Sequence, residues 1–275
     1  MKRPQLHFSG LDKLWTCGEA FRRIYLTGER MPKGTYVAVG SGVDRAVTRN
    51  LEQKILGGNL LDIAEVKDLA RDAATWELEN HDITLDRDER VIGKKQAYAD
   101  AVDKAVRLAA LHAKDVAPKL HPTHVQRPWT IEIPGIKFDL VGTIDVQEGP
   151  ISIRDTKTSG KSPSAGIADM SLQLSMYALA IKTLDGDTPA TVALDYLIDN
   201  KTPVAKTYVS DRNDDDFRVL LARVENAAEI IEKQAFTPAQ PSDWRCSADW
   251  CGFHSNCKYA QQPKSFFNSG KESSK

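Results

Sequence analysis

The apolar positions of the first 120 residues recur every three to four residues, which is the spacing of amphipathic helices. Ser9 can cap a first helix, because Asp12 follows three residues later as in a capping box. Gly57 and Gly58 mark the end of a second helix, and Pro118 follows the last one. The pattern predicts helices at residues 9–26, 41–56, 65–78 and 89–116. The amino-terminal part of the chain is therefore expected to be mostly helical.

After residue 120 the pattern changes to short runs rich in Ile, Val, Phe and Thr, which favour β-strands. Turn residues at 134–135 and 148–150 separate the first three runs, as in an antiparallel meander. Strands are expected at residues 129–133, 138–146, 151–156, 191–198 and 204–209. Two amphipathic helices are expected at residues 169–184 and 214–234. The whole pattern indicates an α/β protein.

Composition narrows the class of protein. The 275 residues include 37 Lys and Arg against 38 Asp and Glu, and 41% of all residues are hydrophobic. This is the composition of a globular domain, and a net charge of −1 excludes a generally basic nucleic-acid coat. No run of about 18 apolar residues predicts a membrane span, and the basic start lacks the apolar stretch of a secretory signal. A cytoplasmic location is the resulting expectation.

The four cysteines are distributed as one near the start of the chain and three near its end. Cys246, Cys251 and Cys257 follow a C-x4-C-x5-C spacing, whereas Cys17 stands alone. In a reducing compartment such a group favours metal over disulfides, and four thiolates suit zinc or an iron–sulfur cluster. His254 lies within the same segment and could replace one thiolate on zinc. Cys17 by itself carries no spacing signal and could equally be a small buried residue.

A group of charged residues follows a predicted hairpin. Asp145 ends one strand, and Asp155 and Lys157 lie on the next, two residues apart and hence on one face. Two carboxylates brought together by a hairpin repel each other unless a cation lies between them, and Mg²⁺ or Mn²⁺ prefers such oxygen ligands. Lys157 could then orient a water molecule or stabilise charge on a phosphate. The alternative is an exposed Asp–Lys pair on a solvated sheet face.

The next predicted helix presents two polar side chains on one face. Gln173 and Tyr177 are four residues apart, so that both can reach phosphate oxygens or hold Lys157 in place. The alternative is an ordinary polar boundary between a helix and a sheet.

These motifs resemble those of a known family. The runs G-T-I-D at 142–145, D-T-K-T at 155–158 and Q-L-S-M-Y at 173–177, in this order, resemble the PD-(D/E)XK nuclease superfamily in its RecB-like branch. Residues 8–26 are similar to the opening motif of iron–sulfur members of that branch, among them AddB-type, CRISPR-associated and phage-encoded exonucleases. The resemblance extends from about Phe8 to Cys257. It implies a central mixed β-sheet flanked by helices, and a 4Fe–4S cluster held by Cys17, Cys246, Cys251 and Cys257.

Two features depart from the family pattern. The family usually spaces its last three cysteines C-x2-C-x5-C, so that zinc remains an alternative to the cluster in this chain. The family also carries a metal-binding His after a glycine, where the run GSGVDRAV places Asp44. An aspartate can bind a hard metal as well. Alternatively, Asp44 is simply favoured in the first turns of a helix by the helix dipole.

The resemblance implies an assignment for each site residue. Mg²⁺ or Mn²⁺ would be held by Asp145, Asp155 and the carbonyl of Thr156, together with Asp44. Lys157 would position the attacking water, and Gln173 and Tyr177 would support Lys157 or the DNA backbone. The basic residues expected to contact phosphates are Arg22, Arg23, Arg30, Lys33 and Lys161.

The implied protein is a metal-dependent DNA exonuclease acting on ends or single strands, in recombination, repair or phage DNA processing. It would be cytoplasmic in a bacterium or phage-infected host, with a possible recombination or replication partner protein and no membrane. The alternative is a non-catalytic DNA- or protein-binding module with a structural zinc. One nuclease domain is expected at residues 1–262, followed by a polar tail at 263–275. Its parts would be helices at about 9–117, the sheet core at about 128–235 and the cysteine segment at 246–257.

Overall fold

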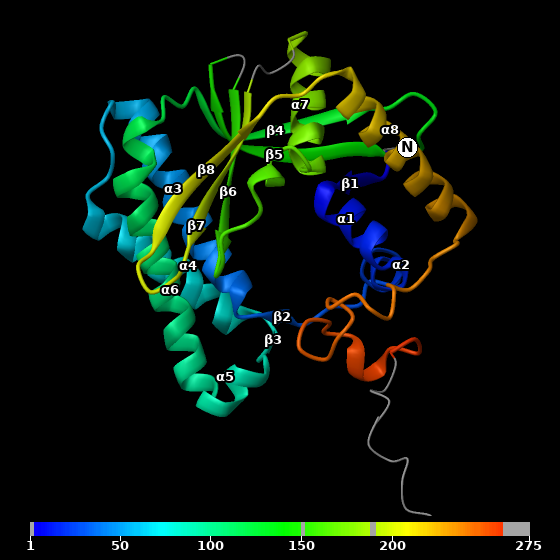
Figure 1. Ribbon diagram of the computed structural model, residues 1–275, viewed down its shortest axis with the longest axis horizontal. Coiled ribbons are helices and arrows are strands. Elements are labelled where there is room, and N and C mark those ends of the chain that lie inside the picture. Colours follow the sequence, from blue (N-terminus) through cyan, green and yellow to red (C-terminus); the bar gives the residue numbers. More distant parts are fainter. Residues whose placement is uncertain (1–2, 150–151, 188–190, 261–275) are drawn as a thin grey trace, which may run out of the picture.

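A mixed β-sheet with helices on both faces forms the core of the protein. The computed structural model describes residues 3–149, 152–187 and 191–260 (Figure 1). The expected tail at 263–275 lies outside the described residues. Six strands make up the main sheet: β1 (Gln5–His7), β4 (His124–Glu132), β5 (Asp139–Glu148), β6 (Ser152–Ser159), β7 (Thr191–Ile198) and β8 (Val204–Ser210).

The order of the strands is β1-β5-β6-β7-β8, and β4 pairs with β5. The pairs β4–β5, β5–β6 and β7–β8 are antiparallel, whereas β1–β5 and β6–β7 are parallel. The expected α/β fold with a central mixed sheet is therefore confirmed. The meander of the first three expected strands is β4, β5 and β6. Gly135, with φ +81°, forms the turn between β4 and β5 and explains the Pro-Gly pair there.

Two apolar clusters cover the two faces of the sheet. On β7, Val192 and Leu194 pack in a cluster with α1 (Phe8–Thr16), α7 (Leu172–Asp185) and α8 (Asp214–Lys233). Leu197 packs on the opposite side against α3 (Tyr36–Gly57) and α6 (Lys94–Asp115). Figure 1 shows α3, α4 (Ile63–Asn80) and α6 on one side of the strands and α7 and α8 on the other. A strand that is buried on both faces reads as a largely apolar run, as β7 does apart from Asp195.

The helical layer consists of α3 (Tyr36–Gly57), α4 (Ile63–Asn80) and α6 (Lys94–Asp115), preceded by the short α5 (Arg87–Ile92). These helices approach closely at Gly42, where a Cβ atom would lie 2.7 Å from the carbonyl oxygen of Ala70. The helix expected to begin at residue 41 begins at Tyr36 instead, since the buried stripe extends back to Val39. The single helix expected at 89–116 is two helices, because Gly93 interrupts it with φ +85°.

The first expected helix, at residues 9–26, is three short pieces. These are α1 (Phe8–Thr16), α2 (Gly18–Phe21) and a π-helical turn (Arg22–Leu26). Cys17 is extended, with φ −155° and ψ 99°, so that it lies between helices rather than on one. The cap expected at Ser9 is also wrong, since α1 continues directly from β1 and begins one residue earlier.

Two helices complete the layer opposite α3. α7 (Leu172–Asp185) connects β6 to β7, and α8 (Asp214–Lys233) follows β8. The side chain of Asn213 caps α8 by accepting hydrogen bonds from the backbone N–H groups of Asp215 and Asp216. No helix within the described residues is long and apolar enough to cross a membrane.

The segment after α8 returns to the beginning of the chain. Gly18 lies against it so closely that a Cβ atom would be 2.9 Å from the backbone nitrogen of Thr237. Further on, Arg245 donates a hydrogen bond to the Thr16 hydroxyl (3.0 Å), and a Cβ at Gly252 would meet the carbonyl oxygen of Pro32 at 2.7 Å. Residues 16–32 and 237–252, which are far apart in the sequence, are thus packed together (Figure 1).

Candidate active site and cysteine cluster

The candidate active site lies where β5 and β6 separate. The two strands pair from Glu148 and Ser152 as far as Val146 and Arg154, and β6 then continues only alongside β7. Asp145 and Asp155 are the next residues on their strands, so that they face the opening. The backbone N–H of Thr156 donates to Asp145 Oδ2 at 3.3 Å, which ties the two strands together at this point.

Several charged side chains lie close together at this opening and have little contact with solvent. Asp155 is only 1% exposed, and its Oδ2 lies 2.7 Å from Lys157 Nζ. Burial and the charge of Asp155 raise the pKa of Asp145 to about 8. Burial also raises the pKa of Asp155, although Lys157 opposes this effect. The alternative of an exposed Asp–Lys pair does not hold. One buried and one half-buried carboxylate beside a single ammonium leave negative charge uncompensated, and carboxylate oxygens are the ligands that a hard divalent cation prefers.

Lys157 is held from α7. Its Nζ donates to Gln173 Oε1 at 2.8 Å, and Gln173 Nε2 donates to the Tyr177 hydroxyl at 2.7 Å. Although burial acts to lower it, the pKa of Lys157 is raised by the charge of Asp155, so that the ammonium stays protonated. Burial likewise raises the pKa of Tyr177, which stays neutral. The i, i+4 pair expected from the sequence is thus joined to Lys157 in one hydrogen-bonded chain.

The glycine of the G-T-I-D run has a packing reason. Trp129 on β4 lies opposite Gly142 on β5, and a Cβ atom there would be 2.5 Å from the indole ring. Trp129 in turn contacts Tyr177 edge to face, with ring centroids 6.2 Å apart. Gly142 therefore leaves room for the indole ring, which contacts Tyr177 edge to face and so supports the Gln173–Lys157 chain.

Asp44 approaches the site from α3. Although Asp44 is exposed on the surface of α3, partial desolvation by surrounding atoms and the charge of Asp155 raise its pKa. Gln126 Nε2 donates to Asp44 Oδ1 (3.1 Å) and to the Thr48 hydroxyl (3.2 Å). Gln126 lies on β4 with φ +52°, between residues that pair normally with β5 on either side of Asp145. A left-handed residue other than Gly inside a strand is strained, and such strain is concentrated at functional sites.

Arg212 is a second residue that the sequence did not single out. It is buried, it forms no ion pair with a carboxylate of the described residues, and this burial lowers its pKa. Its guanidinium donates to the Ser175 hydroxyl (2.8 Å) and to the carbonyls of Ala168 (2.6 Å) and Ser171 (3.1 Å). Arg212 therefore fixes the beginning of α7, the helix that carries Gln173. Neither Gln126 nor Arg212 lies in a motif, and only the fold shows their contacts.

The four cysteines converge although one is more than two hundred residues from the others in sequence. All are free thiols, and they line one small cavity of about 20 Å³ together with His254. Burial and the neighbouring thiols raise the pKa of Cys246. In the described ranges, no three His, Cys, Asp or Glu side chains are already placed to hold a metal ion. The donors of a thiolate site are therefore present, but their side chains would have to close around a metal.

The expected phosphate contacts fall into three groups. Arg30 and Lys161 are exposed on the surface. Arg22 is paired with Glu19, and Lys33 with Glu77. Arg23 differs from the expectation, because it is buried and its guanidinium is not available to a phosphate. Its guanidinium lies 3.9 Å from the centroid of the Phe253 ring and donates to Glu29 and Asn256, so that it joins the π-helical turn to the cysteine segment.

Residues 5–258, which include every helix and strand described above, match the PD-(D/E)XK nuclease superfamily. The chain belongs to the PD-(D/E)XK nuclease superfamily.

Solved structures show the same fold at low sequence identity. A crystal structure described as "Putative exonuclease" from Eubacterium rectale has 14% identity and a TM-score of 0.53, covering 88% of this chain and 86% of that one. Another, described as SSO0001, has 14% identity and a TM-score of 0.37, covering 80% of this chain and 86% of that one. The second likeness is too weak to support an argument. None of the curated proteins matches this chain.

Proposed function

We propose that this protein is a DNA exonuclease of the RecB-like branch, dependent on Mg²⁺ or Mn²⁺ and acting on DNA ends or single strands. The observation that supports this best is the placement of Asp145, Asp155 and Lys157 where β5 and β6 separate. The name of the Eubacterium rectale structure points in the same direction.

The residues of the chain have separable tasks in this proposal. Asp145, Asp155, the Thr156 carbonyl and Asp44 would hold the cation, which when bound offsets the negative charge that develops on the phosphate. Lys157 is too basic to accept a proton, since the charge of Asp155 raises its pKa. It would instead donate hydrogen bonds to the attacking water or to a phosphate oxygen, in a direction fixed by Gln173.

The test compares linear and circular DNA with and without metal. The purified protein is incubated with end-labelled single-stranded, duplex and circular single-stranded DNA in Mg²⁺, Mn²⁺ or EDTA. We expect cleavage of linear DNA only with a divalent metal, and no cleavage of the circle. Cleavage of the circle would indicate an endonuclease. Binding of DNA without cleavage in every metal would support a non-catalytic module instead.

Gln126 offers a finer test of the metal-binding role of Asp44. Gln126→Ala removes the hydrogen bond to Asp44 and should raise the Mn²⁺ concentration for half-maximal cleavage by about tenfold, as expected for a residue that orients a metal ligand. Gln126→Gly removes the same bond but relieves the strained backbone. The glycine variant should therefore melt at a higher temperature than the alanine variant but show the same Mn²⁺ requirement. An unchanged requirement in both variants would show that Asp44 does not depend on Gln126.

We also propose that Cys17, Cys246, Cys251 and Cys257 hold one 4Fe–4S cluster, with a single zinc ion as the alternative. The four thiols line one cavity, and this supports a shared site. The contacts of Arg245 with Thr16 and of Arg23 with Asn256 join the cysteine segment to the first helices. They support treating residues 1–262 as one domain in which the cluster has a structural role.

A further inference from the structure

We infer that a single strand of nucleic acid reaches the candidate site along one face of α3, with unpaired bases stacked on Trp244, Trp250 and Tyr36. This inference rests on the proposed function, and it names the substrate as a single-stranded end rather than a duplex.

The three aromatic side chains form an exposed row. Tyr36 is 54% exposed, Trp250 50% and Trp244 61%. The ring centroids of Tyr36 and Trp250 lie 6.0 Å apart, and those of Trp250 and Trp244 4.8 Å apart at 83°. Large aromatic rings that touch each other and still expose half of their surface leave ring faces free. Stacking of a base on such a face is worth about 1–3 kcal/mol and does not depend on sequence.

The helix α3 connects this row to the candidate site. Tyr36, Gly40 and Asp44 are spaced four residues apart and therefore follow one face of the helix. The distance from Tyr36 to Asp44 along the axis is about 12 Å, at a rise of about 1.5 Å per residue. At about 3.4 Å per nucleotide, that is roughly three to four nucleotides of a stacked strand.

Gly40 keeps this face clear. A Cβ atom at Gly40 would meet nothing within 4 Å, whereas at Gly42, two residues later, it would lie 2.9 Å from the Cβ of Ala105. Gly42 is therefore required for helix packing, but Gly40 has no packing reason. A glycine inside a helix costs about 1 kcal/mol relative to Ala. The bare helix surface at Gly40 lets the backbone of a ligand approach between the aromatic row and Asp44.

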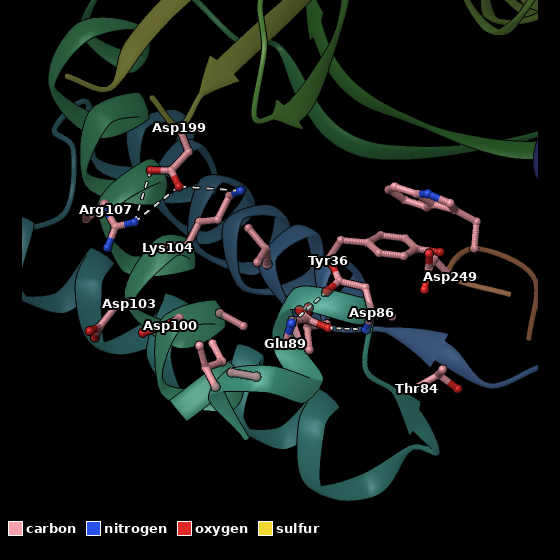
Figure 2. Close-up of a pocket in the computed structure, with 17 residues that line it drawn as sticks. Tyr36, Thr84, Asp86, Glu89, Asp100, Asp103, Lys104, Arg107, Asp199 and Asp249 are labelled. Atoms are coloured by element: carbon pink, nitrogen blue, oxygen red, sulfur yellow. Dashed lines mark hydrogen bonds and ion pairs between the residues drawn. The ribbon is translucent and has the colours of Figure 1, made fainter. Parts of the chain in front are cut away.

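Charge indicates the side on which the phosphates lie. On one side of Tyr36, a hollow of about 220 Å³ is lined by the aromatic row together with Lys13 and Arg245, with Asp12 as an acidic neighbour. On the other side, Tyr36 borders a pocket of about 470 Å³, shown in Figure 2. The acidic side chains lining that pocket are Asp86, Glu89, Asp100, Asp103, Asp199 and Asp249.

The two basic residues of the acidic pocket offset only part of this charge. Lys104 and Arg107 both pair with Asp199, as the dashed lines in Figure 2 show, and five further acidic side chains remain. The pocket therefore repels phosphates. A strand passing over Tyr36 has its phosphates on the other side, where Lys13 rather than Arg245 meets them, because Arg245 already pairs with Asp243 at 2.7 Å.

The test measures binding without cleavage. Fluorescence anisotropy of a labelled 12-nucleotide single strand is recorded in Ca²⁺ for the full chain and for two variants, Tyr36→Ala and Gly40→Leu. Losing one stacked base should weaken binding by about 5- to 150-fold in the first variant. The second should weaken it at least tenfold, because the leucine side chain occupies the path. Both positions are exposed or open, so that melting temperatures should change little.

Matched controls come from α4. Trp76 is 57% exposed, and Ala64 is an exposed helical residue. Trp76→Ala and Ala64→Leu should bind the strand as the unaltered protein does. A blunt duplex should bind more weakly and be insensitive to Tyr36→Ala. Unchanged single-strand affinity in both Tyr36→Ala and Gly40→Leu would overturn the path. Failure of the proposed nuclease activity would appear separately, as the absence of cleavage in Mn²⁺ with this binding pattern intact.

Discussion

Replacing Asp155 by Asn should reduce DNA cleavage in Mn²⁺ at least about 10³-fold while leaving the protein folded. The proposed cation is worth several kcal/mol to the reaction, and each 1.36 kcal/mol corresponds to a factor of ten. Burial raises the pKa of Asp155, so that the charged form is disfavoured by the fold. A neutral side chain of the same shape should therefore leave the melting temperature unchanged or raise it. Lys157→Ala should abolish cleavage as well, because no other ammonium contacts Asp155 among the described residues.

The control for this pair is an ion pair of the same geometry on the surface. Lys182 Nζ lies 2.7 Å from Asp214 Oδ1, the same separation as between Lys157 and Asp155, but both side chains are exposed. Asp214→Asn and Lys182→Ala should retain full activity, since exposed pairs contribute little. Single-turnover rates and thermal melts of the four variants separate lost chemistry from lost folding. Full turnover in both Asp155→Asn and Lys157→Ala would contradict the proposed mechanism.

The strands and their pairing could be predicted because their information is local. Turn residues between runs rich in Ile, Val, Phe and Thr predicted β4, β5 and β6 as a meander, and strands were predicted at the residues of β7 and β8. Asp155 and Lys157 could be paired on one face because side chains on a strand alternate. The Gln173–Tyr177 pair followed from helical spacing in the same way.

The features that could not be predicted from the sequence depend on contacts between segments that are far apart along the chain. The break at Cys17 arises where the chain after α8 packs against Gly18, and no local pattern announces that contact. Gln126 adopts a left-handed backbone conformation that its residue type disfavours, so that residue preferences do not predict this conformation. Arg23 is a basic residue of the kind that contacts phosphates, but the ring of Phe253 covers its guanidinium. Each of these residues owes its role to a partner more than eighty residues away or to tertiary strain.

Because the four cysteines converge, replacing one of them is expected to change the metal content and the melting temperature strongly. Cys251→Ser should bleach the brown colour of protein purified without oxygen, and it should lower the melting temperature by about 10–20 °C. A cluster shared with Cys17 closes a loop of more than two hundred residues, and cross-linking a loop of that size is worth roughly 5 kcal/mol. For a protein of this size, 1 kcal/mol shifts the melting temperature by roughly 2–4 °C. Absorbance spectra, iron and zinc analysis and thermal melts measure these effects.

Two substitutions in the same segment serve as controls. Ser255 is exposed next to His254, so that Ser255→Ala should change neither metal content nor melting temperature. His254→Ala should also retain the metal if four thiolates hold it, and should lose it if His254 replaces one of them on zinc. The cavity lies near α1 and α2, and the candidate active site lies between β5 and β6 (Figure 1). The maximal cleavage rate per folded molecule, measured with saturating DNA, should therefore be unchanged in Cys251→Ser. Finding one zinc ion and no iron in protein purified without oxygen would overturn the iron–sulfur cluster but support a metal cross-link. Finding metal-free protein of full stability would overturn both the cluster and the cross-link.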